Sequence, residues 1–305
     1  MHMIKPPPVA FLLAATLLAG CATTTPQDAR ALQTAMEVNH QATIAVLQAV
    51  NQEMLPFRIQ SSLGNNTFTR ADLVLIAPAD IDAWDKILGG LETYCSALAR
   101  LTSGQSSVDF TAAAEGLAGQ VQSLGKAVKL NSQPGASGVG AAVIEIGTLV
   151  LQHKAARDAR EVATAADSKF QFIIKDLIEA LGYSGDPPQP GNHGVLPAYS
   201  VAYRVATEEN RAITFKDESI AGFGTMDREK KLAAIQAFTG WLATEQEHDR
   251  FIVSFESLVA ALEKTAQAHA ALAHGTSEDL AKQFAELQIH VKSTTAIYQQ
   301  LRKGE

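Results

Sequence analysis

The chain has few of the residues that crosslinking and charge-based binding require. It contains two cysteines in 305 residues, too few for a disulfide scaffold or a four-cysteine zinc module. Aromatic residues make up 6% of the chain and charged residues 19%, with a net charge of −7. A nucleic-acid-binding protein needs a basic face that releases counterions, so this acidic balance argues against one. At 47% hydrophobic residues, the chain can still build a sizeable core.

The N-terminus is typical of a targeting segment. Lys5 supplies positive charge, and residues 9–20 form an uninterrupted run of small or apolar residues. A run of about twelve residues fits the apolar part of a signal peptide, whereas a membrane-spanning helix needs about 20. We therefore expect residues 1–20 to be a signal peptide that is removed.

The apolar run ends in Leu18-Ala19-Gly20-Cys21, which resembles the lipobox of bacterial lipoproteins. The resemblance implies cleavage before Cys21 and acyl chains on its sulfur and on the new amino group. Two or more acyl chains anchor a protein stably, whereas one binds only reversibly. Ala22, rather than an Asp, follows the cysteine, which in Gram-negative members of this class implies the outer membrane. A secretory cleavage site with a coincidental cysteine is the alternative.

Beyond a flexible tether at residues 21–28, the pattern predicts an all-α protein. Apolar residues recur at alternating steps of three and four, as on a helix that turns one face toward a partner helix, and no convincing period-2 run is present. The predicted fold is an elongated antiparallel bundle of about six or seven long helices with coiled-coil-like packing. The predicted helices cover residues 28–54, 78 to about 98, 108–130, 139–181, 198–214 and 227–273, and a last helix from 277 onward.

A Gly- and Pro-rich loop at residues 182–197 divides the predicted helices into two halves. Such a segment can neither continue a helix nor join a strand ladder. The N-terminal half spans residues 29–181 and the C-terminal half 198–305, and we expect both to belong to one bundle. Gly240 is a candidate kink within the longest helix of the second half.

No group of residues has the spacing of a known catalytic or metal site. His269 and His274 are five residues apart, which separates them by about 140° around a helix. The acidic cluster at residues 245–249, which contains His248, would bind a divalent ion only if a second helix added ligands; a solvated helix face is the simpler interpretation. We therefore expect no enzymatic activity, no cofactor and no metal.

Two further features lie on predicted helix faces. His153, Arg160 and Asp167 recur every seven residues, and they form either buried polar layers that fix helix register or a solvated flank. We favour the solvated flank. Cys95 falls on an apolar stripe between Leu91 and Leu98, which predicts a buried and unreactive thiol.

The segment from 135 to 151 supports a second hypothesis. It is nearly all small or apolar and lies between long helices, a layout that resembles helical pore-forming toxins although no motif is shared. Glu145 argues against insertion, because an ionised carboxylate is costly in hydrocarbon. Burial in the core is the simpler interpretation. The candidate membrane-active residues are Gly135, Gly138, Gly140, Val143, Ile144, Ile146, Leu149, Val150 and Leu151.

These features predict a non-catalytic lipoprotein on the periplasmic face of an outer membrane. We expect it to contact the membrane through acyl chains on Cys21 and to act through an unidentified envelope protein, as an interaction or structural component. A homo-oligomer is possible, because a regular heptad pattern can also pair helices between chains. The alternative is a membrane-active helical protein that uses residues 135–151.

Overall fold

The computed structural model describes residues 25–56, 58–59, 73–103, 136–152, 159–182 and 200–303. Over these residues the regular elements are all helical, which confirms the all-α class. The signal peptide, Cys21, the predicted helix at 108–130, and residues 183–197 of the predicted loop lie outside the described residues.

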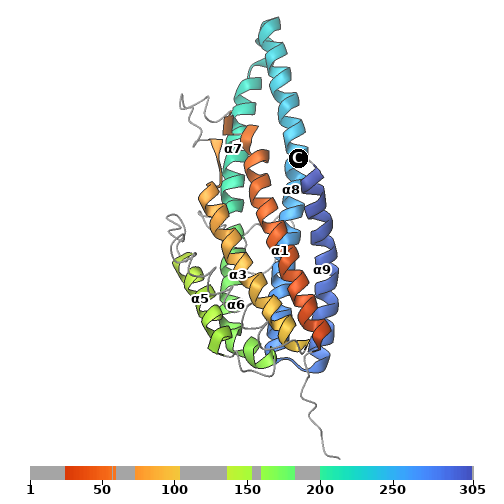
Figure 1. Ribbon diagram of the computed structural model, residues 1–305. Coiled ribbons are helices and arrows are strands. Elements are labelled where there is room, and N and C mark those ends of the chain that lie inside the picture. Colours follow the sequence, from red (N-terminus) through yellow and green to blue (C-terminus); the bar gives the residue numbers. More distant parts are fainter. Residues whose placement is uncertain are drawn as a thin grey trace, which may run out of the picture.

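The helices lie side by side along one long axis (Figure 1). Helix α1 contacts α3, α8 and α9, while α6 contacts α5 and α8, and α7 packs on α8. The elements are α1 (Pro26–Glu53), α3 (Pro78–Thr102), α5 (Ala136–Gln152), α6 (Ala159–Leu181), α7 (Val201–Ile220), the short 3-10 helix η2 (Phe223–Thr225), α8 (Arg228–His274) and α9 (Ser277–Lys303).

Four of the predicted helices match the structure closely. Helix α3 begins at Pro78, and the whole apolar stripe predicted for it is buried. Helix α8 runs without a break from Arg228 to His274, close to the predicted 227–273. Helix α9 begins at Ser277 as expected. Helix α1 begins at Pro26, two residues earlier than predicted, because Thr25 caps it in a reciprocal pair with Asp28. The end of the predicted tether is therefore helical.

The prediction of one long helix over residues 139–181 is wrong. The structure has two helices there, α5 and α6, and they pack against each other. One face of α5 is strongly apolar, and Val139, Val143, Ile146 and Val150 are buried in the common core. A single straight helix would carry that face away from the other helices. The reversal buries it against α3 and α6 instead.

Gly182 marks a close approach between the end of α6 and the start of α7. Its φ is +122°, a conformation that side chains disfavour. A Cβ at this position would lie 2.4 Å from the Cβ of Ala202 and 3.2 Å from Oγ of Ser200. Gly240, in contrast, lies in the exposed part of α8, where an added Cβ would have no neighbour within 4 Å.

We predict opposite effects of the same substitution at these two glycines. Gly182→Ala should lower the free energy of unfolding by about 2 kcal/mol or more, because it adds both backbone strain and overlap. Gly240→Ala should raise it by about 0.5 to 1 kcal/mol, because alanine stabilises a helix interior. Urea unfolding followed by circular dichroism measures both. Equal effects at the two positions would contradict the close approach.

Candidate functional site: a buried hydrogen-bond network between three helices

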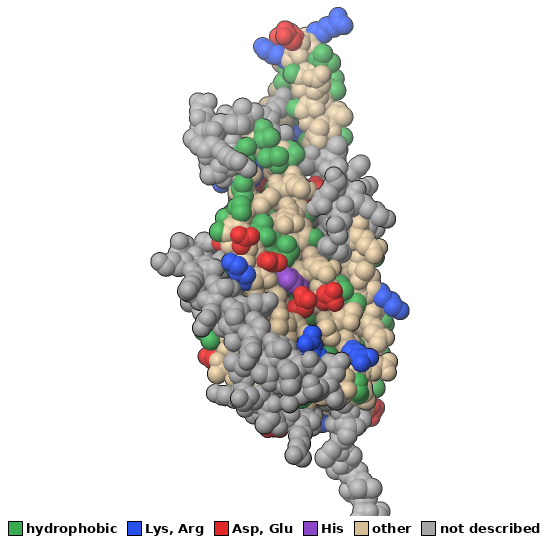
Figure 2. Space-filling view, in the orientation of Figure 1, with side chains coloured by type: hydrophobic (Ala, Val, Ile, Leu, Met, Phe, Trp, Pro, Cys, Tyr) green, Lys and Arg blue, Asp and Glu red, His purple; other side chains and the backbone are tan. Residues whose placement is uncertain are grey.

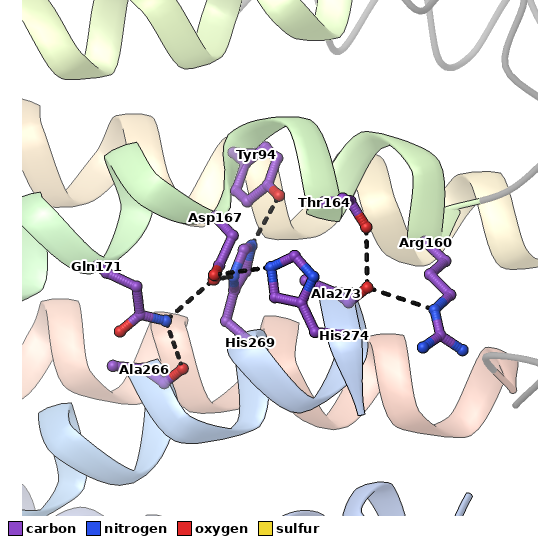
Figure 3. A network of polar contacts seen from close by, with 9 residues as sticks. All are labelled: Tyr94, Arg160, Thr164, Asp167, Gln171, Ala266, His269, Ala273 and His274. Carbon is purple, nitrogen blue, oxygen red and sulfur yellow. Dashed lines mark hydrogen bonds and ion pairs between the residues drawn. The ribbon is translucent and has the colours of Figure 1, made fainter. Parts of the chain in front are cut away.

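A chain of hydrogen bonds crosses the core between α3, α6 and α8 (Figure 3). The hydroxyl of Tyr94 lies 2.8 Å from Nε2 of His269, and Nδ1 of His269 lies 2.8 Å from Oδ1 of Asp167. The other carboxylate oxygen of Asp167 lies 3.1 Å from Nε2 of His274. We call these four residues the Asp167 network.

The protonation states in the network follow from its geometry and burial. Burial tends to raise the pKa of Asp167, but hydrogen bonds from His269 and Gln171 outweigh this effect and hold the pKa below 3.8. Burial lowers the pKa of His269 below 6.5, against the opposing effect of Asp167. Asp167 is thus ionised and His269 neutral near pH 7. Because the carboxylate only accepts, Nδ1 of His269 donates to it, and Nε2 accepts from Tyr94.

Burial also raises the pKa of Tyr94 well above 10, so the phenol keeps the proton that it donates. Tyr94 and His269 are fully buried, whereas the side chain of Asp167 is 15% exposed and that of His274 is 56% exposed. The ring of Phe170 stacks on His269, with centroids 4.1 Å apart and planes 8° apart. The network therefore runs from the core to the surface, and its inner end is sealed by aromatic rings.

Side chains of α6 also bind the C-terminal end of α8. Arg160 donates to the carbonyls of Ala273 and Gly275, with the shorter bond, to Gly275, at 2.7 Å. Thr164 donates to the same Ala273 carbonyl at 2.8 Å. The last carbonyls of a helix lack partners within it, and a cation there also complements the helix dipole. These contacts fix the position of the C-terminal end of α8 along α6.

The favoured interpretation of the seven-residue repeat, a solvated flank, is therefore wrong for Arg160 and Asp167. Both residues bind groups on α8, as the register-fixing alternative required. His153 lies outside the described residues. Gln171 extends the same face by one more turn, because its amide donates to Asp167 at 3.0 Å and to the carbonyl of Ala266 at 2.8 Å.

Polar side chains also join α1 to its neighbours. The buried amide of Asn39 donates to Thr265 of α8 at 2.8 Å. On the surface, the two ring nitrogens of His40 lie 2.9 Å from Asp85 and 2.8 Å from Glu92, both on α3. Figure 2 shows a histidine among acidic side chains on this face. The His40 ring therefore contacts two positions of α3, seven residues apart.

Glu208 of α7 is a further buried charge that the sequence did not reveal. It is 5% exposed and accepts from Arg58 at 3.2 Å and from Arg211 at 2.7 Å. Arg58 follows the end of α1, so this ion pair connects α1 to α7.

The predicted membrane-active segment lies in α5, except for Gly135, which is outside the described residues. Val143, Ile146 and Val150 are buried, and Leu149 is half-buried against the core. Ile144 is exposed, and Glu145 pairs with Lys169 of α6 at 2.6 Å. Within the described part of the chain, no helix combines the length and apolar character needed to cross a membrane.

Cys95 is fully buried, as predicted. Burial, with a smaller contribution from Glu92, raises the pKa of its thiol well above the usual range.

The described residues bring no three His, Cys, Asp or Glu side chains together as a metal site. Of the acidic cluster at 245–249, the structure describes the backbone of α8 but not the side chains.

The Asp167 network orders an aspartate, a histidine and a hydroxyl as in a nucleophilic triad, but each group is already committed. Both ring nitrogens of His269 are bonded, and the Tyr94 hydroxyl is fully buried. In this arrangement neither Tyr94 nor His269 is exposed to solvent. One carboxylate, that of Asp167, joins α6 to two positions on α8.

Sequence spacing missed this site because its members are distant in the chain. His269 and His274 were set aside as 140° apart on one helix, yet both reach Asp167 because His274 is the last residue of α8. The feature of the sequence that could have revealed this site is Asp167 itself, because it is a charged residue placed next to the buried alanines of α6.

Comparison of the chain with protein-family models, curated proteins and solved structures gave no match in any of the three.

We predict that Tyr94→Phe lowers the free energy of unfolding by about 1 to 3 kcal/mol. The change leaves Nε2 of His269 buried without its donor, and an unmade buried hydrogen bond costs this much. Tyr203→Phe is the matched control, because Tyr203 is 42% exposed and should change stability little. Urea unfolding measures both, and equal losses would refute the importance of the bond.

The network also predicts a dependence of stability on pH. The pKa of His269 is lower in the folded protein than its ordinary 6.5, so the unfolded chain binds the proton first as pH falls. This contribution to stability is present above pH 6.5 and is lost as pH falls below it. The lowered pKa of Asp167 acts later, below its ordinary 3.8.

Unfolding of the wild type and of His269→Gln at pH 7 and pH 5 tests this dependence. The stability advantage of the wild type over the variant should shrink between the two pH values, because glutamine does not titrate. His274→Gln is the control for an exposed histidine of the same network. An advantage that grows toward pH 5 would show that His269 is protonated in the folded state.

Proposed function

We propose that this protein is a non-catalytic lipoprotein, anchored through Cys21 on the periplasmic face of an outer membrane. Its body is an elongated antiparallel bundle with coiled-coil-like packing. It acts through protein contacts as an interaction or structural component of the envelope. The observation that carries the proposal is the lipobox-like Leu18-Ala19-Gly20-Cys21 placed directly before a rigid helical body.

The short distance between Cys21 and the body supports this role. Helix α1 begins at Pro26, five residues after Cys21. Four intervening residues span at most about 14 Å when extended, so acyl chains on Cys21 would hold the start of α1 near the membrane surface. The hairpin of α7 and α8 lies at the opposite end of the molecule (Figure 1). A body anchored this way presents that hairpin away from its membrane.

The use of the polar core groups also supports a structural role. The Asp167 network, the Arg160 contacts and the Asn39 amide all join one helix to another. They stiffen the body and offer no group positioned for chemistry on a substrate. Burial of one side of α5 similarly favours a place in the core over membrane insertion, since insertion would require that helix to unpack.

The test is a comparison of wild type with Cys21→Ser in a Gram-negative host. We expect the wild type to carry a lipid-sized mass on its N-terminal residue and to fractionate with the outer membrane, and the variant to lose both. Intact mass spectrometry and density-gradient fractionation provide the measurements. A wild type that is cleaved but soluble and unmodified would overturn the anchor.

Ala22→Asp tests the choice of membrane separately from lipidation. The resemblance to lipoproteins implies that an aspartate after the modified cysteine keeps the protein in the inner membrane. The variant should therefore keep the lipid mass and change its membrane. An unchanged distribution would contradict the assignment to the outer membrane while leaving lipidation intact.

A further inference from the structure

A group of charged side chains lies where the end of α1 meets helix α7. Arg204, Glu208 and Arg211 follow one another at steps of four and three residues on α7, so they share one side of that helix. Arg58, which follows the end of α1, reaches the carboxylate of Glu208 from the neighbouring helix. We call Arg58, Arg204, Glu208 and Arg211 the arginine cluster.

The carboxylate at the centre of the cluster uses its two oxygens unequally. Arg58 and Arg211 both donate to Oε1 of Glu208, at 3.2 Å and 2.7 Å. Among the described residues nothing donates to Oε2, although this atom is buried and the whole residue is only 5% exposed. A buried carboxylate oxygen without a donor is costly, so we expect a further hydrogen-bond donor at this position.

Arg204 is the cation of the cluster that needs a partner. Its side chain is half-buried, and within the described part of the chain its guanidinium forms no hydrogen bond. Burial and the charge of Arg58 both lower the pKa of Arg204, against smaller opposing effects of Asp80 and Glu208. A guanidinium nevertheless stays charged in a protein and presents five N–H donors. The side chain therefore calls for an anion.

The charges that the structure describes at this place do not balance. The three guanidiniums of the cluster face two carboxylates, those of Glu208 and of Asp80 at the start of α3. Burial raises the pKa of Asp80, and Arg204 offsets this only in part. A partly buried surplus of positive charge is costly without an anion, and arginine binds oxyanions well because it offers two parallel hydrogen bonds.

The two unsatisfied groups differ in kind, which restricts the ligand. Arg204 requires an acceptor, whereas Oε2 of Glu208, one helical turn away, requires a donor. A phosphate group that carries a proton offers both, because its ionised oxygens accept and its P–OH group donates. Sulfate carries no proton at neutral pH, so it offers acceptors alone and would be repelled by the Glu208 carboxylate.

We propose that the arginine cluster binds a protonated phosphate group, either free phosphate or a phosphate monoester. Arg204 donates to the ionised oxygens of the phosphate, and the P–OH group donates to Oε2 of Glu208. Arg58 and Arg211 hold the carboxylate in place through Oε1. A phosphodiester has no P–OH group and does not fit. The site adds a ligand-binding function that does not depend on lipidation of Cys21.

Isothermal titration calorimetry of the full-length chain in a phosphate-free buffer tests the site. We expect inorganic phosphate to bind one-to-one with a dissociation constant below about 1 mM, and sulfate to bind at least about tenfold more weakly. No binding of phosphate up to about 10 mM overturns the proposal. Equal binding of phosphate and sulfate also overturns it, because unspecific charge attraction then accounts for both.

Glycerol 3-phosphate separates the two sources of the phosphate group. A dissociation constant equal to that of inorganic phosphate shows that the site accepts a monoester. Binding that is at least about tenfold weaker assigns the site to the free ion.

Three variants test the roles of the side chains. Arg204→Gln should weaken phosphate binding at least about tenfold, whereas the matched control Arg100→Gln, which removes an exposed arginine of α3, should leave it unchanged. Glu208→Gln should reduce the preference for phosphate over sulfate, because an amide can also donate. Circular dichroism checks that the variants are folded. An unchanged preference in Glu208→Gln would contradict the donor–acceptor match.

Thermal unfolding distinguishes a ligand site from a structural ion pair. Without phosphate, Arg204→Gln should leave the melting temperature unchanged or raise it, because the substitution removes a charge that Arg58 repels. With phosphate at about 10 mM, the melting temperature of the wild type should rise and that of the variant should not. A variant that is less stable than the wild type without phosphate would show that Arg204 is already bonded within the chain, which overturns the proposal.

Discussion

The relative position of the core helices depends on the hydrogen bonds that the carboxylate of Asp167 accepts. A partly buried charge is costly unless hydrogen bonds satisfy it, so the packing of α8 on α6 must bring His269 and His274 to this residue. A shift of α8 by one turn relative to α6 would take both histidines away from the charge and leave it only Gln171, which lies on α6 itself. Apolar seams of alanine tolerate several registers, and this network selects one of them.

The contacts around His269 also fix the positions of the protons in the network. Neutral His269 is held between an ionised acceptor and a protonated phenol, so its proton has one stable position. Ring stacking by Phe170 covers one face of the imidazole. The aspartate, the histidine and the phenol satisfy one another, and this joins α3, α6 and α8 at one point of the core.

Much of the fold was predictable because it follows local rules. The regular apolar spacing of α3, the proline at its start, and the glycine between α8 and α9 predicted those elements from the sequence. The break between α5 and α6 was not predictable in this way. No proline or glycine stands between them in His153 to Asp158, and the chain reverses because the apolar face of α5 gains burial by doing so.

The candidate site was less predictable than the fold. Asp167 and Arg160 could be recognised as periodic charges, but their partners lie about a hundred residues away on α8. Nothing in the local spacing of His269 and His274 indicates that both reach the same carboxylate on α6. The exposure of Leu232, Ile235 and Leu242 was also hidden, because their spacing in the sequence is the same as that of buried helix residues.

The start of α1 and the hairpin of α7 and α8 lie at opposite ends of the molecule (Figure 1). Helix α8 has 47 residues and spans about 70 Å at 1.5 Å per residue. A molecule held at the start of α1 would therefore carry the α7–α8 hairpin at a distance of the same order from its point of attachment.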